Sequence, residues 1–343
     1  MSGSPEDKAV YRLYRKTYGW TRPVGEVDLD EVSPTPRDRA RIAYYLGNNS
    51  RPLSVRLSAE PGSRGPFSPT ITGKDIQTWY RQQVIGEGYT VPLLNLFRLL
   101  PEAYRRKPFL YVWGDHSSIH PQAGILAKTR VIGDASASLL KLRPVRHFGL
   151  LQDKALKNRI PFREKLNRVC WRGTTSGLRR DAGNRHALVS RYWEKKKRFD
   201  VGYSRASPIV ERYPHLKAFI KGKLSLNEQL RNKFLISLEG NDVSSGLKWM
   251  LASNSVVLMC KPTVESWLME GRLRPFEHFI PIKPDFSDLE EQVDWALANE
   301  RKCLEIAKCA NAYMEPFKDP VRETFLEREV LRAHLDHVAI QPV

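Results

Sequence analysis

The segment from Lys233 to Leu297 reads KFLISLEG-NDVSSGLKWMLASN-SVVLMCK-PTVESWLMEG-RLRPFEHFIPIK-PDFSDLEEQVDWAL. Three short apolar runs alternate in it with helical patterns, and the first run ends at Gly240. Strands that alternate with helices over about 60 residues predict a parallel sheet built from crossover units. Ligands of such sheets bind at the carboxyl ends of the strands. The loop after Gly240 is therefore a candidate binding loop.

Small residues in this loop suit the approach of a phosphate group. Ser244, Ser245 and Gly246 come directly before a helical pattern, where free backbone N–H groups and the positive end of the helix dipole attract anions. Lys248 lies in the first helical turn, where a cation is unfavourable unless an anion is bound nearby. Ordinary helix caps and a solvated lysine would explain the same residues. Neither a P-loop nor a dinucleotide-binding fingerprint is present.

Size and charge point to two domains and an anionic partner. The chain has 343 residues, is 41% hydrophobic and carries a formal net charge of +18. This length is enough for two domains of ordinary size. The charge favours a nucleotide, a nucleic acid, a phosphorylated glycan or an acidic membrane face as partner.

The four cysteines and the N-terminus bear on location and metal binding. No two cysteines form a C-x-x-C pair, so a zinc site is not indicated. The first residues, MSGSPEDKAV, lack the apolar core of a secretory signal. No apolar run approaches the roughly 20 residues that span a bilayer. We expect a cytoplasmic protein, or one that is peripheral at the inner membrane.

Two further strand patterns end in polar residues. Pro108 to Trp113 (PFLYVW) is followed by Gly114, Asp115 and His116, and Val169 to Trp171 is followed by Arg172, Gly173 and Thr174. Both halves of the chain thus have the sequence pattern of α/β domains. A cleft between two such domains is the natural place for a ligand-binding site.

Five motifs in a fixed order resemble those of glycosyltransferase family 90. They are LLKLRPVRHF (139–148), WRGTTSG (171–177), SLEGNDVSSGLKWMLASNSVVLM (237–259), ESWLMEG (265–271) and HFIPIKPDFSDLEE (278–291). That family includes bacterial lipopolysaccharide glycosyltransferases, fungal capsule xylosyltransferases and animal protein O-glucosyltransferases. The chain looks most similar to the bacterial group, and the resemblance covers roughly residues 108–297.

The resemblance implies an α/β fold of GT-B type, with two Rossmann-type domains facing a cleft. Residues 1–155 would form an acceptor-side domain, on which the C-terminal helices of 311–343 pack back. Residues 156–310 would form the domain that binds the nucleotide sugar.

The resemblance also implies an inverting transfer of a sugar from a UDP-sugar to a glycan hydroxyl, with lipopolysaccharide core as the expected acceptor. No cofactor is expected beyond the UDP-sugar, which is the donor substrate. No metal is expected either, and no obvious D-x-D lies between the expected strands to carry a divalent ion. Peripheral contact with an anionic membrane face is a further expectation, whereas a nucleic-acid partner is not expected.

The matching positions receive roles from the family. Asp115 is the expected general base, and Glu265 is the expected ligand of the ribose hydroxyls. Animal members carry an arginine where this chain has Gly246, which puts direct charge neutralisation by a side chain there in doubt. The residues expected around the donor phosphates are Arg172, Gly173, Thr174, Asn241, Asp242, Ser244, Ser245, Gly246 and Lys248. Those expected near the donor sugar or acceptor are His116, Arg143, Arg146 and His147.

Three alternatives stay open at this point. The first is a protein O-glycosyltransferase like the animal members. The second, suggested by charge alone, is a basic nucleic-acid-binding protein, for which no helix-turn-helix, RRM or zinc-finger pattern is visible. The third is a catalytically inactive scaffold, against which the presence of Asp115, Arg172 and Glu265 counts.

Overall fold

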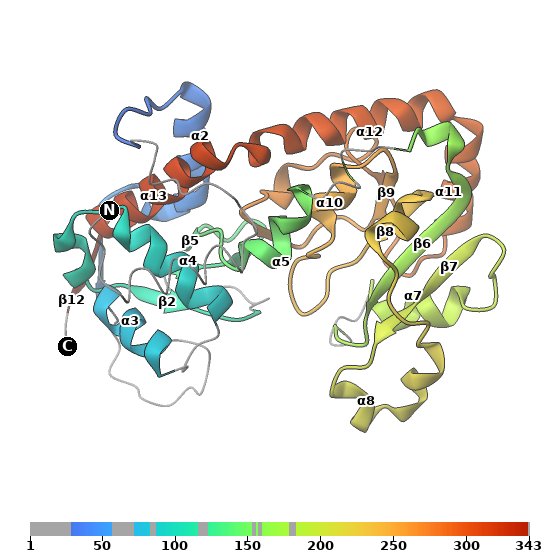
Figure 1. The fold of residues 1–343 in the computed structure, drawn as a ribbon, viewed down its shortest axis with the longest axis horizontal. Coiled ribbons are helices and arrows are strands. Elements are labelled where there is room, and N and C mark those ends of the chain that lie inside the picture. The colour runs from blue at the N-terminus through green and yellow to red at the C-terminus, as the bar shows by residue number, and fades with distance from the viewer. Residues whose placement is uncertain are drawn as a thin grey trace. The chain divides into compact units, whose positions relative to one another are not determined.

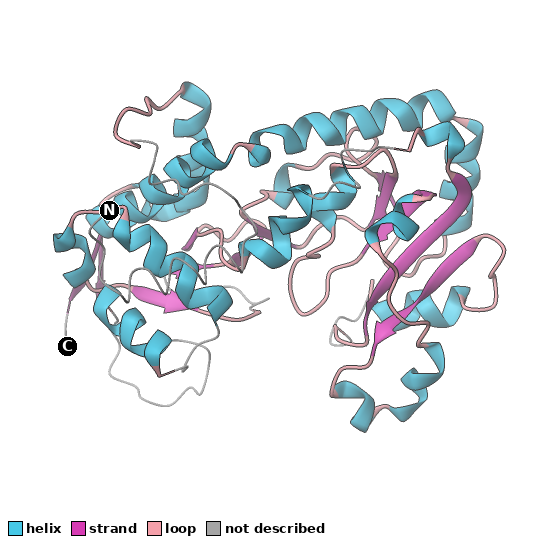
Figure 2. Ribbon diagram, in the orientation of Figure 1, coloured by secondary structure: helices cyan, strands magenta, loops and turns pink. Residues whose placement is uncertain are grey.

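A computed structural model of the chain describes residues 29–56, 72–82, 87–115, 123–152, 156, 160–177 and 183–341. The chain divides into two compact units. Unit 1 comprises Met1–Gly149, Val264–Leu268 and Asp319–Val343, and unit 2 comprises Leu150–Thr263 and Met269–Lys318. Figure 1 shows the elements in chain order, and Figure 2 shows that helices and strands are mixed in both units.

A five-stranded parallel sheet forms the centre of unit 2. Its strand order is β11-β9-β8-β6-β7, and each neighbouring pair is parallel. The predicted parallel sheet is therefore confirmed. Every residue of β8 is buried, as expected for a strand covered on both faces. The strands are β6 (Leu166–Thr174), β7 (Phe199–Arg205), β8 (Asn232–Ser237), β9 (Val256–Met259) and β11 (Ile280–Pro281).

Helices connect these strands. Asn184 caps α7 by accepting a hydrogen bond from the N–H of Ala187, which satisfies one of the free donors of the first turn. The side chain of Asn311 in α12 donates to the carbonyl groups of Leu251 and Ser253, which ties α12 to the end of α10. The α-helices of unit 2 are α7 (Arg185–Tyr192), α8 (Ile209–Arg212), α9 (Leu226–Leu230), α10 (Leu247–Leu251), α11 (Leu289–Ala298) and α12 (Glu300–Met314). Short 3₁₀ helices are η5 (Phe162–Glu164), η6 (Pro214–Phe219), η7 (Glu270–Arg272) and η8 (Glu315–Lys318).

Unit 1 contains a smaller parallel sheet of three strands in the order β2-β3-β5. A parallel pair, β1 with β12, and an antiparallel pair, β4 with β10, complete its strands. Apolar residues of β1, β2, β3, β5 and β12 pack into one core. The strands are β1 (Leu53–Arg56), β2 (Leu110–Val112), β3 (Ile125–Ala127), β4 (Thr129–Val131), β5 (Ala137–Leu139), β10 (Val264–Ser266) and β12 (Val338–Gln341).

The helices of unit 1 come from both ends of the chain. Thr35 and Asp38 form a capping box at the start of α2, and Asp319 caps α13 by accepting from the N–H groups of Val321 and Arg322. The helices are α2 (Pro36–Leu46), α3 (Gly73–Arg81), α4 (Glu87–Arg98), α5 (Pro144–Phe148) and α13 (Pro320–His337), with the 3₁₀ helices η2 (Gly47–Ser50), η3 (Glu102–Arg106) and η4 (Gly149–Gln152), the last of which ends beyond the unit.

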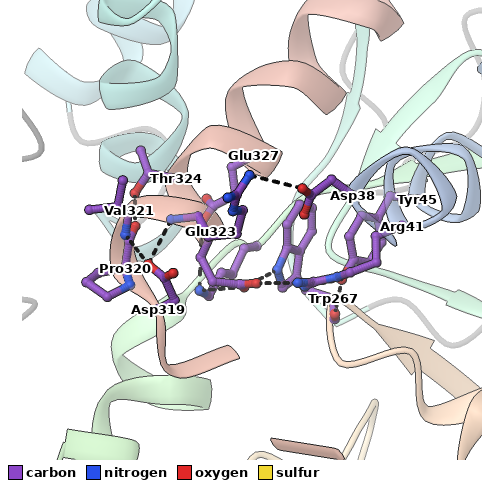
Figure 3. A network of polar contacts seen from close by, with 12 residues as sticks. Asp38, Arg41, Tyr45, Trp267, Asp319, Pro320, Val321, Glu323, Thr324 and Glu327 are labelled. Carbon is purple, nitrogen blue, oxygen red and sulfur yellow. Dashed lines mark hydrogen bonds and ion pairs between the residues drawn. The ribbon is translucent and has the colours of Figure 1, made fainter. Parts of the chain in front are cut away.

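A buried polar network joins the three chain segments of unit 1. Glu323 of α13 forms ion pairs with Arg41 of α2 (2.7 Å) and Lys141 (3.1 Å), and accepts a hydrogen bond from the indole of Trp267 (2.7 Å). The ring of Tyr45 stacks on that of Trp267 with centroids 3.8 Å apart. Figure 3 shows Glu323 directed toward Arg41 and Trp267. Because one carboxylate serves all three segments, the network fixes their relative placement.

The division into units differs in detail from the expected domain boundaries. The first segment of unit 1 ends at Gly149 and its last segment begins at Asp319. The predicted end and start of these segments were residues 155 and 311. The assignment of Val264–Leu268 to unit 1 was not expected at all. No helix in the described ranges is long and apolar enough to cross a membrane.

Candidate active site

The carboxyl ends of all three parallel strands of unit 1 carry charged residues. Asp115 follows β2, Lys128 comes directly after β3, and Arg143 follows β5. Since parallel strands end at one edge of their sheet, these side chains gather there. The Nζ atom of Lys128 lies 2.6 Å from Oδ1 of Asp115.

Asp115 is held as a carboxylate. Partial burial acts to raise its pKa, but the charge and hydrogen bond of Lys128, with Arg146 and Arg143 nearby, outweigh burial and leave the pKa of Asp115 below its usual value. The side chain keeps a third of its surface exposed. An ionised, accessible carboxylate at a strand end can accept a proton from a bound hydroxyl group.

Tyr89 of α4 organises the cations around Asp115. The Nζ atom of Lys128 lies 5.9 Å from the centroid of the Tyr89 ring, and Cζ of Arg143 lies 5.3 Å from it. Cations at these distances are attracted by the ring face. Gly88 permits the packing, because a Cβ atom there would come within 3.2 Å of Nε of Arg143.

Arg143 has an unusual backbone conformation. Its φ of 53° lies in the left-handed region, which a non-glycine residue occupies only when its surroundings impose it. Its N–H donates to the carbonyl of Gly88 (2.8 Å), and its own carbonyl accepts from the N–H of His147 (3.2 Å). Strained residues of this kind cluster at functional sites, and the place of Arg143 beside the substrate stays a prediction.

The other residues predicted near the acceptor fall in different environments. Arg146 is exposed and contributes to the field at Asp115. His147 is buried in α5. His116 lies outside the described residues, so its expected role stays a prediction.

Arg172 in β6 pairs within its own sheet. Its guanidinium donates to the side chain (2.7 Å) and carbonyl (2.8 Å) of Asp200 and to the carbonyl of Trp171 (2.9 Å). Asp200 is the second residue of β7, so Arg172 turns toward the amino end of that strand and away from the carboxyl-end loops. Contact between Arg172 and a phosphate stays a prediction. For that contact, Arg172 would have to release Asp200 and the carbonyl of Trp171.

The predicted phosphate loop follows β8 at the carboxyl edge of the sheet. Asn241 is exposed, Ser244, Ser245 and Gly246 are half-buried, and Asp242 is buried, where its carboxylate accepts from the N–H of Val243. The following helix α10 has only five residues. Its dipole therefore attracts an anion less strongly than a longer helix would.

Lys248 does not serve this loop as a free cation. Its side chain is 0% exposed, and Nζ lies 2.7 Å from Oε1 of Glu270, which is 2% exposed. A buried ammonium requires such a partner because desolvation of an unpaired charge is costly. Compensation of a bound anion by Lys248 stays a prediction, and it would require Lys248 to give up Glu270. The alternative of a solvated lysine is wrong, because the side chain is buried.

Removal of both charges tests whether Lys248 contacts the ligand. The double substitution Lys248→Met with Glu270→Leu should leave UDP affinity unchanged, since a buried ion pair replaced by apolar residues is often tolerated. Calorimetric titration with UDP would measure it. A Kd that rises in the double variant but returns to the wild-type value with Glu270→Leu alone would mean that Lys248 does contact the ligand.

Arg185 occupies the place at the loop edge that the sequence assigned to other cations. Its Nη1 atom donates to the hydroxyl groups of Thr174 (3.1 Å) and Ser176 (3.0 Å) beyond β6. A Cβ atom on Gly240 would come within 2.5 Å of its Nη2 atom, so a larger residue there would require the guanidinium to move. Arg185 thus lies between the loops that follow β6 and β8.

Glycines bring the same two loops together. Gly177, with a φ of 86°, lies so close that a Cβ atom on it would be 2.8 Å from Cα of Gly240. Within β6, the carbonyl of Gly173 accepts a hydrogen bond from the hydroxyl of Ser204 (3.0 Å). The hydroxyls of Thr174 and Ser176 are 2.7 Å apart, so two donors and a guanidinium face one small region.

Glu265 belongs to unit 1 and not to the nucleotide-binding half that the sequence predicted. It lies in β10, is buried, and bonds to Arg130 through Oε1 (2.8 Å) and to the hydroxyl of Tyr44 through Oε2. Both carboxylate oxygens therefore hold β10 to β4 and α2. Contact between Glu265 and the ribose hydroxyls stays a prediction, and it would require Glu265 to give up Arg130 or Tyr44.

Sequence reasoning missed Lys128, Tyr89 and Arg185. The signals were present but weak: Lys128 directly follows an apolar run, and Arg185 follows a capping asparagine. Among the described residues, no group of three or more His, Cys, Asp or Glu side chains could hold a metal ion.

Comparison with known proteins gives a consistent assignment. The model of the family described as "Glycosyl transferase family 90" matches residues 141–318. The O-glucosyltransferase LpsA of Dichelobacter nodosus is 34% identical over 248 residues, which are 72% of this chain and 71% of that protein. Protein O-glucosyltransferase 3 is 28% identical in Rattus norvegicus and 27% in Homo sapiens, each over 32% of this chain and 22% of the relative. The chain belongs to glycosyltransferase family 90 and is a glycosyltransferase.

Proposed function

We propose that this glycosyltransferase transfers a sugar from a UDP-sugar to a hydroxyl group of a bacterial surface glycan, with inversion at the anomeric carbon. The observation that carries the proposal is Asp115, an accessible carboxylate at the carboxyl end of β2 that is surrounded by Lys128, Arg143 and Arg146. Asp115 is the proposed general base.

In the proposed reaction, the acceptor hydroxyl gives its proton to Asp115 as its oxygen bonds to the anomeric carbon of the donor. The bond from that carbon to the diphosphate oxygen breaks, and UDP leaves with the electron pair. One base and a positively charged leaving-group site are sufficient for this displacement. The proposal includes no metal ion.

The donor diphosphate is proposed to bind at the loops after β6 and β8 in unit 2. Supporting residues are Thr174, Ser176 and Arg185, which already converge there, and the small residues 244–246. A Cβ at Gly246 would come within 3.0 Å of Met250, so a longer side chain at that point would require a shift. Arg185 is the proposed substitute for the charge that Gly246 cannot supply.

The proposed acceptor is lipopolysaccharide core. The net charge of +18 would suit a phosphorylated acceptor at an anionic membrane face. Protein O-glucosyltransferase 3 is similar over part of the chain, so a protein hydroxyl is the second candidate. Relatives named as O-glucosyltransferases make UDP-glucose the first donor to test.

The test is calorimetric titration with UDP, UDP-glucose, UDP-galactose and UDP-xylose in the presence of EDTA. It is followed by assay of UDP release with lipopolysaccharide core oligosaccharide or an acceptor peptide. Micromolar binding of one UDP-sugar and its turnover on the oligosaccharide support the proposal. Turnover that requires a divalent ion would refute the metal-free reaction, and salt-dependent oligonucleotide binding without UDP binding would favour a nucleic-acid function.

Arg185→Ala should raise the Kd for UDP by about tenfold or more, because a hydrogen bond to a charged group contributes about 1.5–3 kcal/mol. Arg172→Ala should have the smaller effect, since Arg172 is engaged by Asp200. Arg191→Ala is the matched control, because Arg191 is exposed on the same helix α7. Calorimetry with UDP measures all three. A larger loss of UDP affinity in Arg172→Ala than in Arg185→Ala would show that Arg172 is the main phosphate contact.

A further inference from the structure

Lys128 is placed so that it orients one oxygen of Asp115 and leaves the other to react. Its Nζ atom contacts Oδ1 at 2.6 Å, and among the described residues the structure shows no hydrogen bond or ion pair to Oδ2. We infer that Lys128 is a positioning residue, which turns Asp115 so that Oδ2 receives the proton of the acceptor hydroxyl. This inference rests on the proposed function.

The backbone around Lys128 is fixed on both sides. The preceding residue, Ala127, pairs with Val112 of β2, and the following residue, Thr129, pairs with Ser266 of β10. Lys128 therefore joins two strands that pair with different partners, and its position relative to β2 is set by the ladder. Since Asp115 lies three residues beyond Val112, the same sheet places both members of the pair.

The side chain of Lys128 has little freedom. It is 4% exposed, and the ring of Tyr89 lies beside its ammonium group. A buried ammonium is stabilised by a carboxylate partner, and Asp115 supplies one at 2.6 Å. A group that is held in its reactive orientation before binding loses less entropy in the transition state.

Charge also distinguishes this site. The charged groups that face Asp115 are Lys128 beyond β3 and Arg143 and Arg146 at α5. Partial burial opposes ionisation of Asp115, and these cations favour it. Removal of the Lys128 charge should therefore raise the pKa of Asp115 toward or above its usual value. The acid limb of kcat/KM, which reports the base in the free enzyme, should then move to higher pH.

The experiment compares Lys128→Met, Lys128→Arg, Asp115→Asn and the double variant Asp115→Asn with Lys128→Met. UDP release from UDP-glucose onto lipopolysaccharide core oligosaccharide is measured across pH. We expect Lys128→Met to lower kcat by about 10–100-fold through misplacement of the base, to leave the Kd for UDP unchanged, and to move the acid limb to higher pH. In the Asp115→Asn background it should cause no further loss, because the two residues act as a unit.

Two controls separate this role from a structural one. Lys107→Met breaks an ion pair of the same length, 2.6 Å, with Asp336 in the same unit, and should change neither kcat nor the acid limb. Lys128→Arg keeps the charge and changes the geometry, so it should lower kcat without moving the acid limb. If Lys128→Met fails to fold, as seen by circular dichroism, the arginine variant decides.

The outcomes distinguish this inference from the proposed function. Independent, multiplying losses in the double variant, an unmoved acid limb in Lys128→Met, or wild-type kcat in Lys128→Arg would each overturn the role of Lys128. Wild-type protein that neither binds UDP nor turns over any UDP-sugar would instead overturn the proposed function.

Discussion

Asp115→Asn should reduce sugar transfer by at least ~100-fold, the lower end of what general-base catalysis contributes. The amide keeps the size of the side chain but cannot take a proton from the acceptor hydroxyl. UDP binding should be unchanged, because the proposed diphosphate loops belong to unit 2 and Asp115 belongs to unit 1. UDP release at saturating donor and acceptor, combined with UDP calorimetry, measures both quantities.

The control is Asp336→Asn, which makes the same chemical change in an exposed pair with Lys107. That variant should keep full turnover. Transfer by Asp115→Asn at the wild-type rate would show that another group is the base, and loss of UDP affinity would show that Asp115 supports the donor site.

Glu323→Ala should destabilise unit 1 by about 3–5 kcal/mol, the cost of leaving buried charges without their partner. Glu323 is 2% exposed and is shared by Arg41 and Lys141, which are themselves buried. Trp267 would lose the acceptor for its indole N–H as well. Urea unfolding followed by circular dichroism and tryptophan fluorescence would measure the change.

Glu327→Gln is the matched control. Glu327 lies one turn further along α13 and also faces Lys141, at 3.8 Å. Burial raises the pKa of Glu327 to about 8 despite Lys141, so it carries a proton at neutral pH and the amide resembles its native state. Stability within about 0.5 kcal/mol of wild type is expected for this variant. Equal losses in Glu323→Ala and Glu327→Gln would mean that the ion pairs of Glu323 do not hold the network.

The parallel sheet of unit 2 could be predicted because its signal is local. Short apolar runs and helical patterns alternate within the segment itself, so β8, β9 and β11 were recognisable without knowledge of their partners, whereas β7 was not predicted. The strand 108–113 likewise located Asp115 at a strand end, as the structure has it in β2.

The sequence did not show which carboxylates pair with the cations and acids of the candidate site, because these partners are distant in sequence. Lys248 pairs with Glu270 across 22 residues, Arg172 with Asp200 across 28, and Arg130 with Glu265 across 135. A sequence shows that a cation is present but not which carboxylate neutralises it. Residue type alone therefore does not show which cations are already paired within the protein, and it overlooked Arg185, whose role depends on two loops meeting.

The pairing of β1 with β12 has a consequence for how the protein is made. Leu53 of β1 pairs with Val338 of β12. This pairing cannot form until almost the whole described chain has been synthesised. Glu323 and Trp267 are likewise synthesised long after Arg41. Unit 2 can complete its sheet first, while unit 1 stays unfinished and exposes apolar strands that favour aggregation. A nascent chain that stalls before residue 319 should therefore depend on chaperones to keep its N-terminal half in solution.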